Sequence, residues 1–411
     1  MPQSRAERKL RRRIDEAAQL FGAGDVDGAK KSLERLLAKS PTIFRHEVHH
    51  HLASIARELG DGKSAIAHLG RAAKLQPTDP ETWLKLGIVS LESQSFEASA
   101  DAFERLVQLV PNKAEPLVFL ATALQGNEKF AEAISVYEQA LALEPNHPSA
   151  WTNLAGSFLQ VGNWQDACHA ANRQIALRPG HIGALSLKSV ALQELGSTNA
   201  WREIVDFDRL VGRFDITPDT AQFPDLQTFN HALADYCKGH PSLAYEPTNN
   251  TTTLGWQTSD LAHDDEKAVT ILLSCIEACV QQYLQARPVD PTHPYLSQRP
   301  AGWDYYLWGT ILGAQGHQVS HVHPDGWLSG VYYAAVPLSI DKDPKAENRN
   351  GWIEFGRSQA YPKSKAVPET KTFEPIEGRL YLFPSYFYHR TIPFESDEKR
   401  VSLAFDLMPR A

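Results

Sequence analysis

Residues 111–151 read PNKAEPLVFLATALQGNEKFAEAISVYEQALALEPNHPSAW, and this stretch sets the pattern of the first half of the chain. Four prolines recur at intervals of 34 residues, namely Pro77, Pro111, Pro145 and Pro179. The same interval separates Trp83, Leu117 and Trp151. Because proline cannot continue a helical hydrogen-bond ladder, each of the four is expected to end the second helix of a repeated helix pair. The interval therefore predicts a solenoid of stacked helix pairs.

The period and its markers resemble the tetratricopeptide repeat. Between Leu117 and Pro145, the residues Ala133, Tyr137 and Ala140 stand at the offsets of that repeat. Helical segments in phase extend the pattern in both directions, and we expect the solenoid to occupy residues 1–213. A solenoid of helix pairs offers an extended surface to another polypeptide. A peptide or protein partner is therefore expected for this half, and the chemistry is expected in the remainder.

The composition argues against several classes of protein. The chain has 411 residues, a formal net charge of −8 and 42% hydrophobic residues. The acidic balance argues against nucleic-acid binding, and the basic residues of segment 5–13 are expected to begin the first helix. No apolar run approaches the roughly 18 residues of a membrane span, so no membrane partner is predicted. The four cysteines form neither a disulfide framework nor a zinc pattern, which fits a reducing cytoplasm.

Four histidines cluster in one predicted helix, namely His46, His49, His50 and His51. Only residues three or four positions apart share a face of a helix, so only such pairs could chelate a metal ion. The sequence shows no third ligand for them. They are therefore expected to be partly exposed residues of the solenoid.

The residue pattern of the sequence changes at about residue 215, where the 34-residue periodicity ends. Short aromatic and β-branched segments separated by turn residues follow, including YYLWGTILG at 305–313, LSGVYYAAVPLS at 328–339, RLYLFPS at 379–385 and RVSLAFDLM at 400–408. Such runs predict an antiparallel β-sandwich or barrel in residues 214–411. Only LLSCIEACVQQYL, at 272–284, keeps a helical pattern here, and it should pack on the outside of the sheet.

Three histidines of this region form a candidate metal site. His321 and His323 alternate with Val322 and therefore point to the same face of a strand. His389 follows a later strand and turn. Two ligands from one strand and a histidine from a facing strand make a facial site with open positions. Such a site suits non-haem Fe(II), which must bind a bidentate cosubstrate and then dioxygen.

Other polar residues are placed to bind that cosubstrate. Arg400 opens the strand after His389, where its guanidinium can form a bidentate salt bridge with a carboxylate. Ser402 faces the same way and can add a hydrogen bond. Tyr333, in the strand after the first two histidines, can donate to the same carboxylate.

The motifs around these residues resemble those of the double-stranded β-helix oxygenases that use Fe(II) and 2-oxoglutarate, which include the prolyl hydroxylases. The motifs are HVHPDGWLSGVYY at 321–333, GRLYLFPSYFYH at 378–389 and RVSLAF at 400–405, with GWQTSDL at 255–261 as a further landmark. The resemblance spans roughly residue 255 to the C-terminus. It implies a jelly-roll domain with flanking helices and the cofactors Fe(II) and 2-oxoglutarate. It also implies oxidative decarboxylation of 2-oxoglutarate to succinate, with one oxygen atom passing to a C–H bond of a second substrate.

The identity of the metal ligands stays open at this point. The usual triad contains an His-x-Asp motif, but the residue two positions after His321 is His323, and Asp325 lies two positions further on. The triad is therefore either His321, His323 and His389 or His323, Asp325 and His389. A third arrangement, which pairs His321 with Asp325, would require the turn to fold back. Strand alternation slightly favours the three histidines, whereas Asp325 would supply a negative charge. Trp327, beside this turn, is expected to border the substrate pocket.

The sequence as a whole predicts a cytoplasmic hydroxylase in which the repeats present a peptide or protein substrate to a jelly-roll oxygenase domain. The alternative is a scaffold whose repeats bind a partner and whose β domain is a degenerate, non-catalytic jelly roll. The intact set of histidines with Arg400 argues against degeneration.

Overall fold

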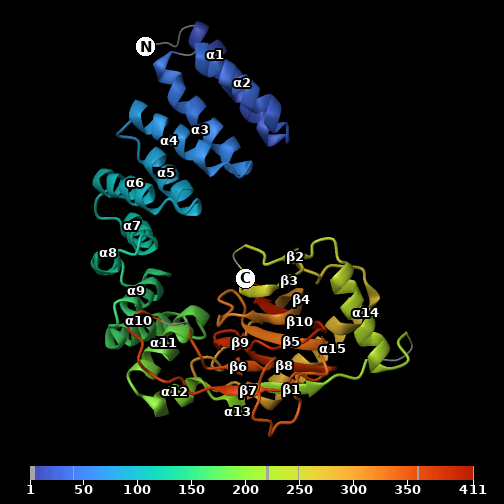
Figure 1. The fold of residues 1–411 in the computed structure, drawn as a ribbon. Helices are drawn as coiled ribbons and strands as arrows, with labels where there is room; N and C mark the ends of the chain where they lie inside the picture. Colours follow the sequence, from blue (N-terminus) through green and yellow to red (C-terminus); the bar gives the residue numbers. More distant parts are fainter. Residues whose placement is uncertain (1–4, 40, 219–221, 249, 359–360, 411) are drawn as a thin grey trace. The chain divides into compact units, whose positions relative to one another are not determined.

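The computed structural model describes residues 5–39, 41–218, 222–248, 250–358 and 361–410. The chain forms two compact units, Met1–Val161 and Gly162–Ala411, and Figure 1 labels their helices and strands. The first unit is helical, and the second combines helices with β-sheet. No helix in the described ranges is long and apolar enough to cross a membrane.

Consecutive helices build the first unit. They are α1 (Arg5–Gly22), α2 (Val26–Lys39), α3 (Thr42–Glu58), α4 (Gly62–Leu75), α5 (Pro80–Glu92), α6 (Phe96–Leu109), α7 (Ala114–Gly126), α8 (Phe130–Leu143) and α9 (Ala150–Gln160). Each helix packs against the next one in the chain. Helices α4, α6 and α8 end two residues before Pro77, Pro111 and Pro145, which confirms the role expected for the periodic prolines.

The recurring tryptophans hold the turns between helix pairs. The indole N–H of Trp83 donates to the carbonyl oxygen of Pro77 at 3.0 Å, and Trp151 makes the same bond to Pro145 at 2.8 Å. Tyr137, at another repeat position, is fully buried. Trp83 and Trp151 therefore recur because each makes the same turn contact in its helix pair.

The second unit begins with helices that pack onto its sheet. They are α10 (Trp164–Leu177), α11 (Ile182–Glu194), α12 (Thr198–Ile204) and α13 (Phe207–Leu210). Leu185, Trp201 and Phe207 share one buried core with the sheet residues, and the Tyr386 hydroxyl donates to the backbone oxygen of Ile204. The boundary between the two compact units thus follows residue 161, whereas the solenoid was expected from the sequence to extend to residue 213.

Two antiparallel sheets form the rest of the second unit in the described part of the chain. The larger sheet has the order β1-β8-β5-β10-β4-β3-β2, and the smaller has the order β7-β6-β9. The strands are β1 (Gly212–Asp215), β2 (Ala244–Tyr245), β3 (Thr252–Gln257), β4 (Trp303–Gln318), β5 (Leu328–Ala335), β6 (Ile353–Phe355), β7 (Lys371–Phe373), β8 (Arg379–Pro384), β9 (His389–Thr391) and β10 (Arg400–Pro409). The sheets pack face to face, since the rings of Phe355 and Phe383 lie 4.8 Å apart between centroids. This arrangement confirms the jelly roll.

Helices α14 (Leu226–Gly239) and α15 (Lys267–Ala286) flank the larger sheet (Figure 1). The Tyr332 hydroxyl of β5 donates to the side chain of Asn230 on α14, and the Tyr305 hydroxyl of β4 lies 2.5 Å from Glu277 on α15. Because side chains alternate along a strand, the next residue of β5, Tyr333, points to the opposite face, toward the smaller sheet. The periodicity of the sequence indicated only α15, whereas the resemblance implied flanking helices in the plural, and the structure has both α14 and α15.

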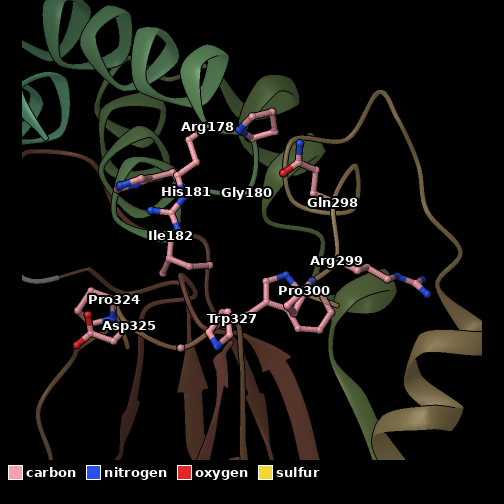
Figure 2. A pocket seen from close by; sticks show the side chains of 13 residues that line it. Arg178, Gly180, His181, Ile182, Gln298, Arg299, Pro300, Pro324, Asp325 and Trp327 are labelled. Carbon is pink, nitrogen blue, oxygen red and sulfur yellow. The ribbon is translucent and has the colours of Figure 1, made fainter. Parts of the chain in front are cut away.

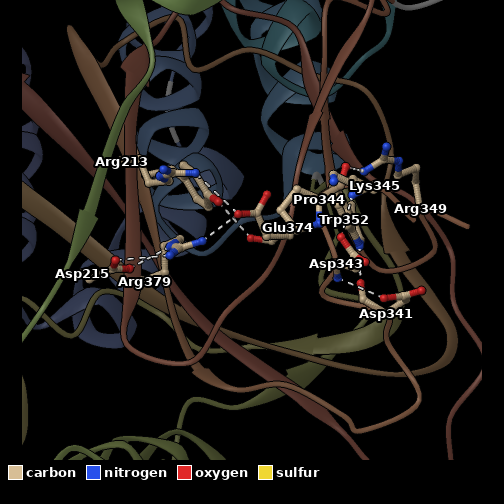
Figure 3. Close-up of polar contacts among 11 residues, drawn as sticks. Arg213, Asp215, Asp341, Asp343, Pro344, Lys345, Arg349, Trp352, Glu374 and Arg379 are labelled. Atoms are coloured by element: carbon tan, nitrogen blue, oxygen red, sulfur yellow. Dashed lines mark hydrogen bonds and ion pairs between the residues drawn. The ribbon is translucent and has the colours of Figure 1, made fainter. Parts of the chain in front are cut away.

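The edge of the larger sheet is held by a partly buried arginine, Arg379. Arg379 of β8 lies opposite Asp215 of β1 and donates to its carboxylate at 2.7 Å and to Glu374 at 2.6 Å (Figure 3). Arg213 of β1 lies 3.6 Å from the same Glu374 carboxylate. Strand β1 is therefore an integral part of the sheet, although it begins before the expected domain boundary.

Candidate metal centre

The candidate site lies where the two sheets meet. After β4 the chain bends at Ser320, and the backbone of His321 then pairs with that of His389 on β9 through two hydrogen bonds, of 3.1 and 3.0 Å. His323 follows, and its backbone N–H donates to the carbonyl oxygen of Ser385 at 3.0 Å. These backbone bonds fix all three histidines relative to one another.

The three imidazole rings converge on one point. One nitrogen from each of His321, His323 and His389 lies within 4.8 Å of the others, and the Nε2 atoms of His323 and His389 are 3.3 Å apart. Each Nδ1 is occupied elsewhere: His321 bonds to the carbonyl oxygen of Val319 at 2.7 Å, and His389 to that of Phe387 at 2.9 Å. Because a carbonyl oxygen only accepts, each Nδ1 carries the proton and each Nε2 presents a lone pair.

The carboxylate of Asp406 on β10 orients the third ring. Its Oδ2 atom accepts from Nδ1 of His323 at 2.8 Å, and its Oδ1 atom accepts from the Ser329 hydroxyl at 2.6 Å. A carboxylate behind an imidazole fixes its tautomer and increases the basicity of the other nitrogen. Asp406 was not among the residues expected from the sequence. The signal was present, because Asp406 continues the alternation of Arg400 and Ser402 along one face of β10.

Burial keeps His321 and His389 neutral. It lowers the pKa of His321 to about 3, with a further contribution from His323. Burial also lowers the pKa of His389 well below its usual value, together with the two neighbouring rings. Unprotonated lone pairs that face one another at 3.3 Å repel, and a bound cation would relieve that repulsion.

Asp325 lies apart from this cluster. It is exposed in the turn after His323 and is not one of the described residues whose ligand atoms converge. Trp327 is buried, and its ring stacks on Tyr295 at 5.4 Å between centroids. It lines a neighbouring cavity and not the space between the histidines.

Arg400 lies on the same inner face of β10, with its side chain enclosed. It is 2% exposed, bonds to the Thr391 hydroxyl at 3.2 Å and lies 4.8 Å from the centre of the Tyr333 ring. No carboxylate among the described residues forms an ion pair with it, and its Nε atom and the Tyr333 hydroxyl are buried without a hydrogen-bond partner. Burial accordingly lowers the pKa of the guanidinium. A buried cation of this kind favours a ligand with a carboxylate.

Ser402 completes this end of the site. It lies opposite Thr310 on β4 and Tyr333 on β5, and all three are buried. The Thr310 hydroxyl also has no partner, and neither does the indole N–H of Trp308 on the same face of β4. The described residues between the histidines and Arg400 thus present several unsatisfied donors, which fits an anionic oxygen-rich ligand.

Two adjoining cavities connect these groups to solvent. A narrow cavity of about 20 Å³ lies between the histidines and Arg400. A wider one, of about 480 Å³, lies beside it and shares Trp308, Gln318, His321 and His323 with it. The narrow cavity holds about one water molecule, so a ligand that reaches Arg400 requires side chains there to move aside.

A further cavity lies on the other side of the turn that carries Asp325. It measures about 210 Å³ and shares Pro324 and Asp325 with the wide cavity. Figure 2 shows Arg178, His181 and Ile182 on one side of it, with Trp327 and Asp325 across from them. The end of α10 and the start of α11 thus line a cavity that shares the turn after His323 with the wide cavity.

Facing sheets with a converging set of histidines define a double-stranded β-helix protein with a candidate metal centre. Residues 306–406 match the family described as "Putative 2OG-Fe(II) oxygenase", and residues 51–114 and 120–182 match the family described as "Tetratricopeptide repeat". The chain therefore carries tetratricopeptide repeats followed by a domain of this oxygenase family, as the resemblance of its motifs implied.

The solved structures that resemble the chain cover less than half of it. The "Crystal structure of MamA protein" has 23% identity and a TM-score of 0.37 over 38% of this chain and 86% of that chain. "MamA 41-end from Desulfovibrio magneticus RS-1" has 18% identity and a TM-score of 0.36 over 41% and 93%. "Functional Characterization of Pseudomonas Aeruginosa pilF" has 17% identity and a TM-score of 0.37 over 49% and 90%. No curated protein matches the chain.

Proposed function

We propose that the second unit is an Fe(II)- and 2-oxoglutarate-dependent oxygenase whose metal ion is held by His321, His323 and His389. The observation that carries the proposal is the convergence of three imidazoles, each with Nδ1 already bonded, beside a buried arginine that has no acidic partner among the described residues. Three ligands on one side leave positions free for a cosubstrate and dioxygen.

Residues of β5, β9 and β10 would bind the cosubstrate. Arg400 would pair with the distal carboxylate of 2-oxoglutarate, and Tyr333 and Ser402 would donate to the same group. Thr391 already bonds to the guanidinium and would hold it in place. Gln318 and Trp308 line the narrow cavity and would have to adjust for the cosubstrate to reach Arg400.

Bound together, Fe(II) and 2-oxoglutarate supply the oxidising chemistry: the cosubstrate is decarboxylated to succinate, and one oxygen atom of dioxygen passes to a C–H bond of the second substrate. The protein's own contribution is to bind and orient. Asp406 keeps the Nδ1 proton on His323, so that Nε2 faces the centre. Val331 and Phe383 line the narrow cavity and limit the access of water to it.

The second substrate is proposed to be a peptide or protein segment in the wide cavity. Tyr306, Trp308 and Met408 give this cavity apolar surface, and Asn250, Gln257 and Gln318 add amide groups that can bond to a peptide backbone. Tetratricopeptide repeats are surfaces for polypeptides, and a bound partner has a raised local concentration at a site in the same chain.

Succinate release tests the proposal. Purified full-length protein with Fe(II) and ascorbate should convert 2-oxoglutarate to succinate slowly without substrate, and His389→Ala should abolish the conversion. The scaffold alternative predicts neither iron binding nor succinate from either protein. Wild-type protein that binds Fe(II) anaerobically with no affinity for 2-oxoglutarate would contradict the proposed activity.

A further inference from the structure

A second group of metal-ligating side chains lies in the first unit. His46 and His50 on α3 and Asp79 at the start of α5 have ligand atoms that all lie within 4.8 Å of one another. The sequence suggested the histidine pair but no third ligand. The structure supplies one because the repeat brings residue 79 of the next helix pair against the face of α3.

The two imidazoles point at the same place. His46 and His50 are one helical turn apart, and their ring centroids are 4.6 Å apart. The hydroxyl oxygen of Thr82 lies 2.8 Å from Nε2 of His46 and 2.7 Å from Nε2 of His50. Both nitrogens therefore converge on one small volume, and the hydroxyl of Thr82 borders it.

The carboxylate of Asp79 lies at the distance that metal ligation requires. Its Oδ2 atom is 3.3 Å from Nε2 of His46. Tetrahedral zinc with bonds of about 2.0–2.1 Å separates neighbouring ligand atoms by about 3.3 Å. Asp79 is also fixed in position, since it caps α5 by accepting from the backbone N–H groups of Glu81 at 3.3 Å and Thr82 at 3.2 Å. The side chains of His46 and Asp79 are only 15% and 26% exposed, so water competes little for them.

We propose that His46, His50 and Asp79 bind a divalent transition-metal ion of the Zn²⁺ type, with the Thr82 hydroxyl or water as a further ligand. Two imidazoles and one carboxylate form a donor set that such ions prefer over Mg²⁺ or Ca²⁺. The ion would join α3 to α5 and so connect consecutive helix pairs of the solenoid. In its absence the same groups form a hydrogen-bonded network around Thr82, in which both histidines donate and the hydroxyl donates to Asp79.

Zinc titration of the full-length chain tests this site separately from the jelly roll. In a His323→Ala/His389→Ala background, which disables the other histidine cluster, about one equivalent of Zn²⁺ should still bind. Adding His50→Ala should weaken that binding by more than about 100-fold, because even the loss of a partner of a ligand costs about 10–100-fold. His51→Ala, on the same helix but outside the cluster, is the matched control and should leave the binding unchanged.

Asp79→Asn is a second variant that should still fold, because asparagine caps a helix as well as aspartate does but carries no charge. This variant should keep its far-UV circular dichroism and melting temperature without metal, and lose both the bound zinc and the rise in melting temperature that zinc produces. Zinc binding by Asp79→Asn and His50→Ala that equals binding by His51→Ala would overturn the proposal. Both outcomes are independent of oxygenase activity.

Discussion

Asp406→Asn is the substitution that tests the metal centre most directly. In the folded protein Asp406 accepts one hydrogen bond from Nδ1 of His323 at 2.8 Å and one from Ser329 at 2.6 Å. Asparagine has the same shape, its oxygen can still accept from His323, and its amide can donate to the Ser329 hydroxyl. The substitution therefore removes the negative charge behind the imidazole while keeping both contacts and the fold.

The expected loss of metal affinity follows from that geometry. Partners of metal-bound histidines typically contribute about 10–100-fold to affinity, which corresponds to about 1.4–2.7 kcal/mol. Asp406 is 7% exposed, so solvent screens its charge little. We therefore expect a loss toward the upper end of this range. The iron should still be bound at high concentration, because all three imidazoles remain.

Anaerobic titration with Fe(II), or with Mn(II) as a redox-stable substitute, measures the effect in the full-length protein. Asp325→Asn is the matched control, since this carboxylate is exposed and lies outside the histidine cluster. It should bind iron like the wild type, whereas His389→Ala should bind none at this site. An iron-free Asp325→Asn protein beside an unaffected Asp406→Asn protein would refute the three-histidine assignment and favour the carboxylate triad.

Other substitutions test the cosubstrate site, helix capping and domain limits. Arg400→Ala should raise the 2-oxoglutarate requirement for succinate release by tens- to thousands-fold, since losing such a buried ion pair costs about 2–5 kcal/mol; anaerobic iron binding should not change. Trp308→Phe keeps an aromatic ring but removes an indole N–H that has no partner within the protein and could donate to a ligand. Calorimetry should therefore show about 5–10-fold weaker binding of 2-oxoglutarate or substrate. Equal affinities of variant and wild type would place this N–H outside the ligand site. Burial lowers the pKa of His181, whose Nδ1 accepts a backbone N–H at the start of α11. Below about pH 6.5 the imidazole of His181 therefore binds a proton in the unfolded chain but not in the folded protein, so the stability of the fold falls as the pH drops below this value. The melting temperature of His181→Asn should fall less steeply with pH than that of the wild type. A fragment of residues 162–411 should show cooperative unfolding, whereas 214–411, which lacks α10 to α13, should not. Cooperative unfolding of the shorter fragment would contradict the shared core.

The repeat architecture could be predicted because its markers are periodic. The packing of helices α11 and α12 against the sheet could not be predicted. An apolar face on α11 or α12 is compatible with a neighbouring helix pair or with a β-sheet. Trp201 and Phe207 are buried against residues far along the chain, and the local pattern does not indicate such a partner. Helix α14 was missed although Phe229, Leu233 and Cys237 follow a helical spacing, because nearby proline and asparagine clusters suggested loops.

In the candidate site too, the sequence predicted what depends on neighbouring residues and did not predict what depends on residues far apart in the chain. Strand alternation predicted that His321 and His323 point together, and the converging rings agree with it. The partner of His323 is 83 residues away, so only the pairing of β5 with β10 brings Asp406 behind the ring. Asp79 illustrates the point for the first unit, since its approach to His46 depends on how successive helix pairs stack.

Strand β10 explains how one segment can serve both the metal and the cosubstrate. Arg400, Ser402 and Asp406 all stand at even-numbered positions and share its inner face, so a one-residue slip of the strand would turn all three away from the site. The pairing with β5 shifts between Val401 and Ser402, where a bulge of this kind typically re-aims a side chain or ends the pairing. The bulge lies next to Arg400 and not next to Asp406. Because the ladder between β10 and β4 is regular from Arg400 to Pro409, it fixes both the carboxylate behind His323 and the direction of Arg400, which bonds to Thr391 of the opposite sheet.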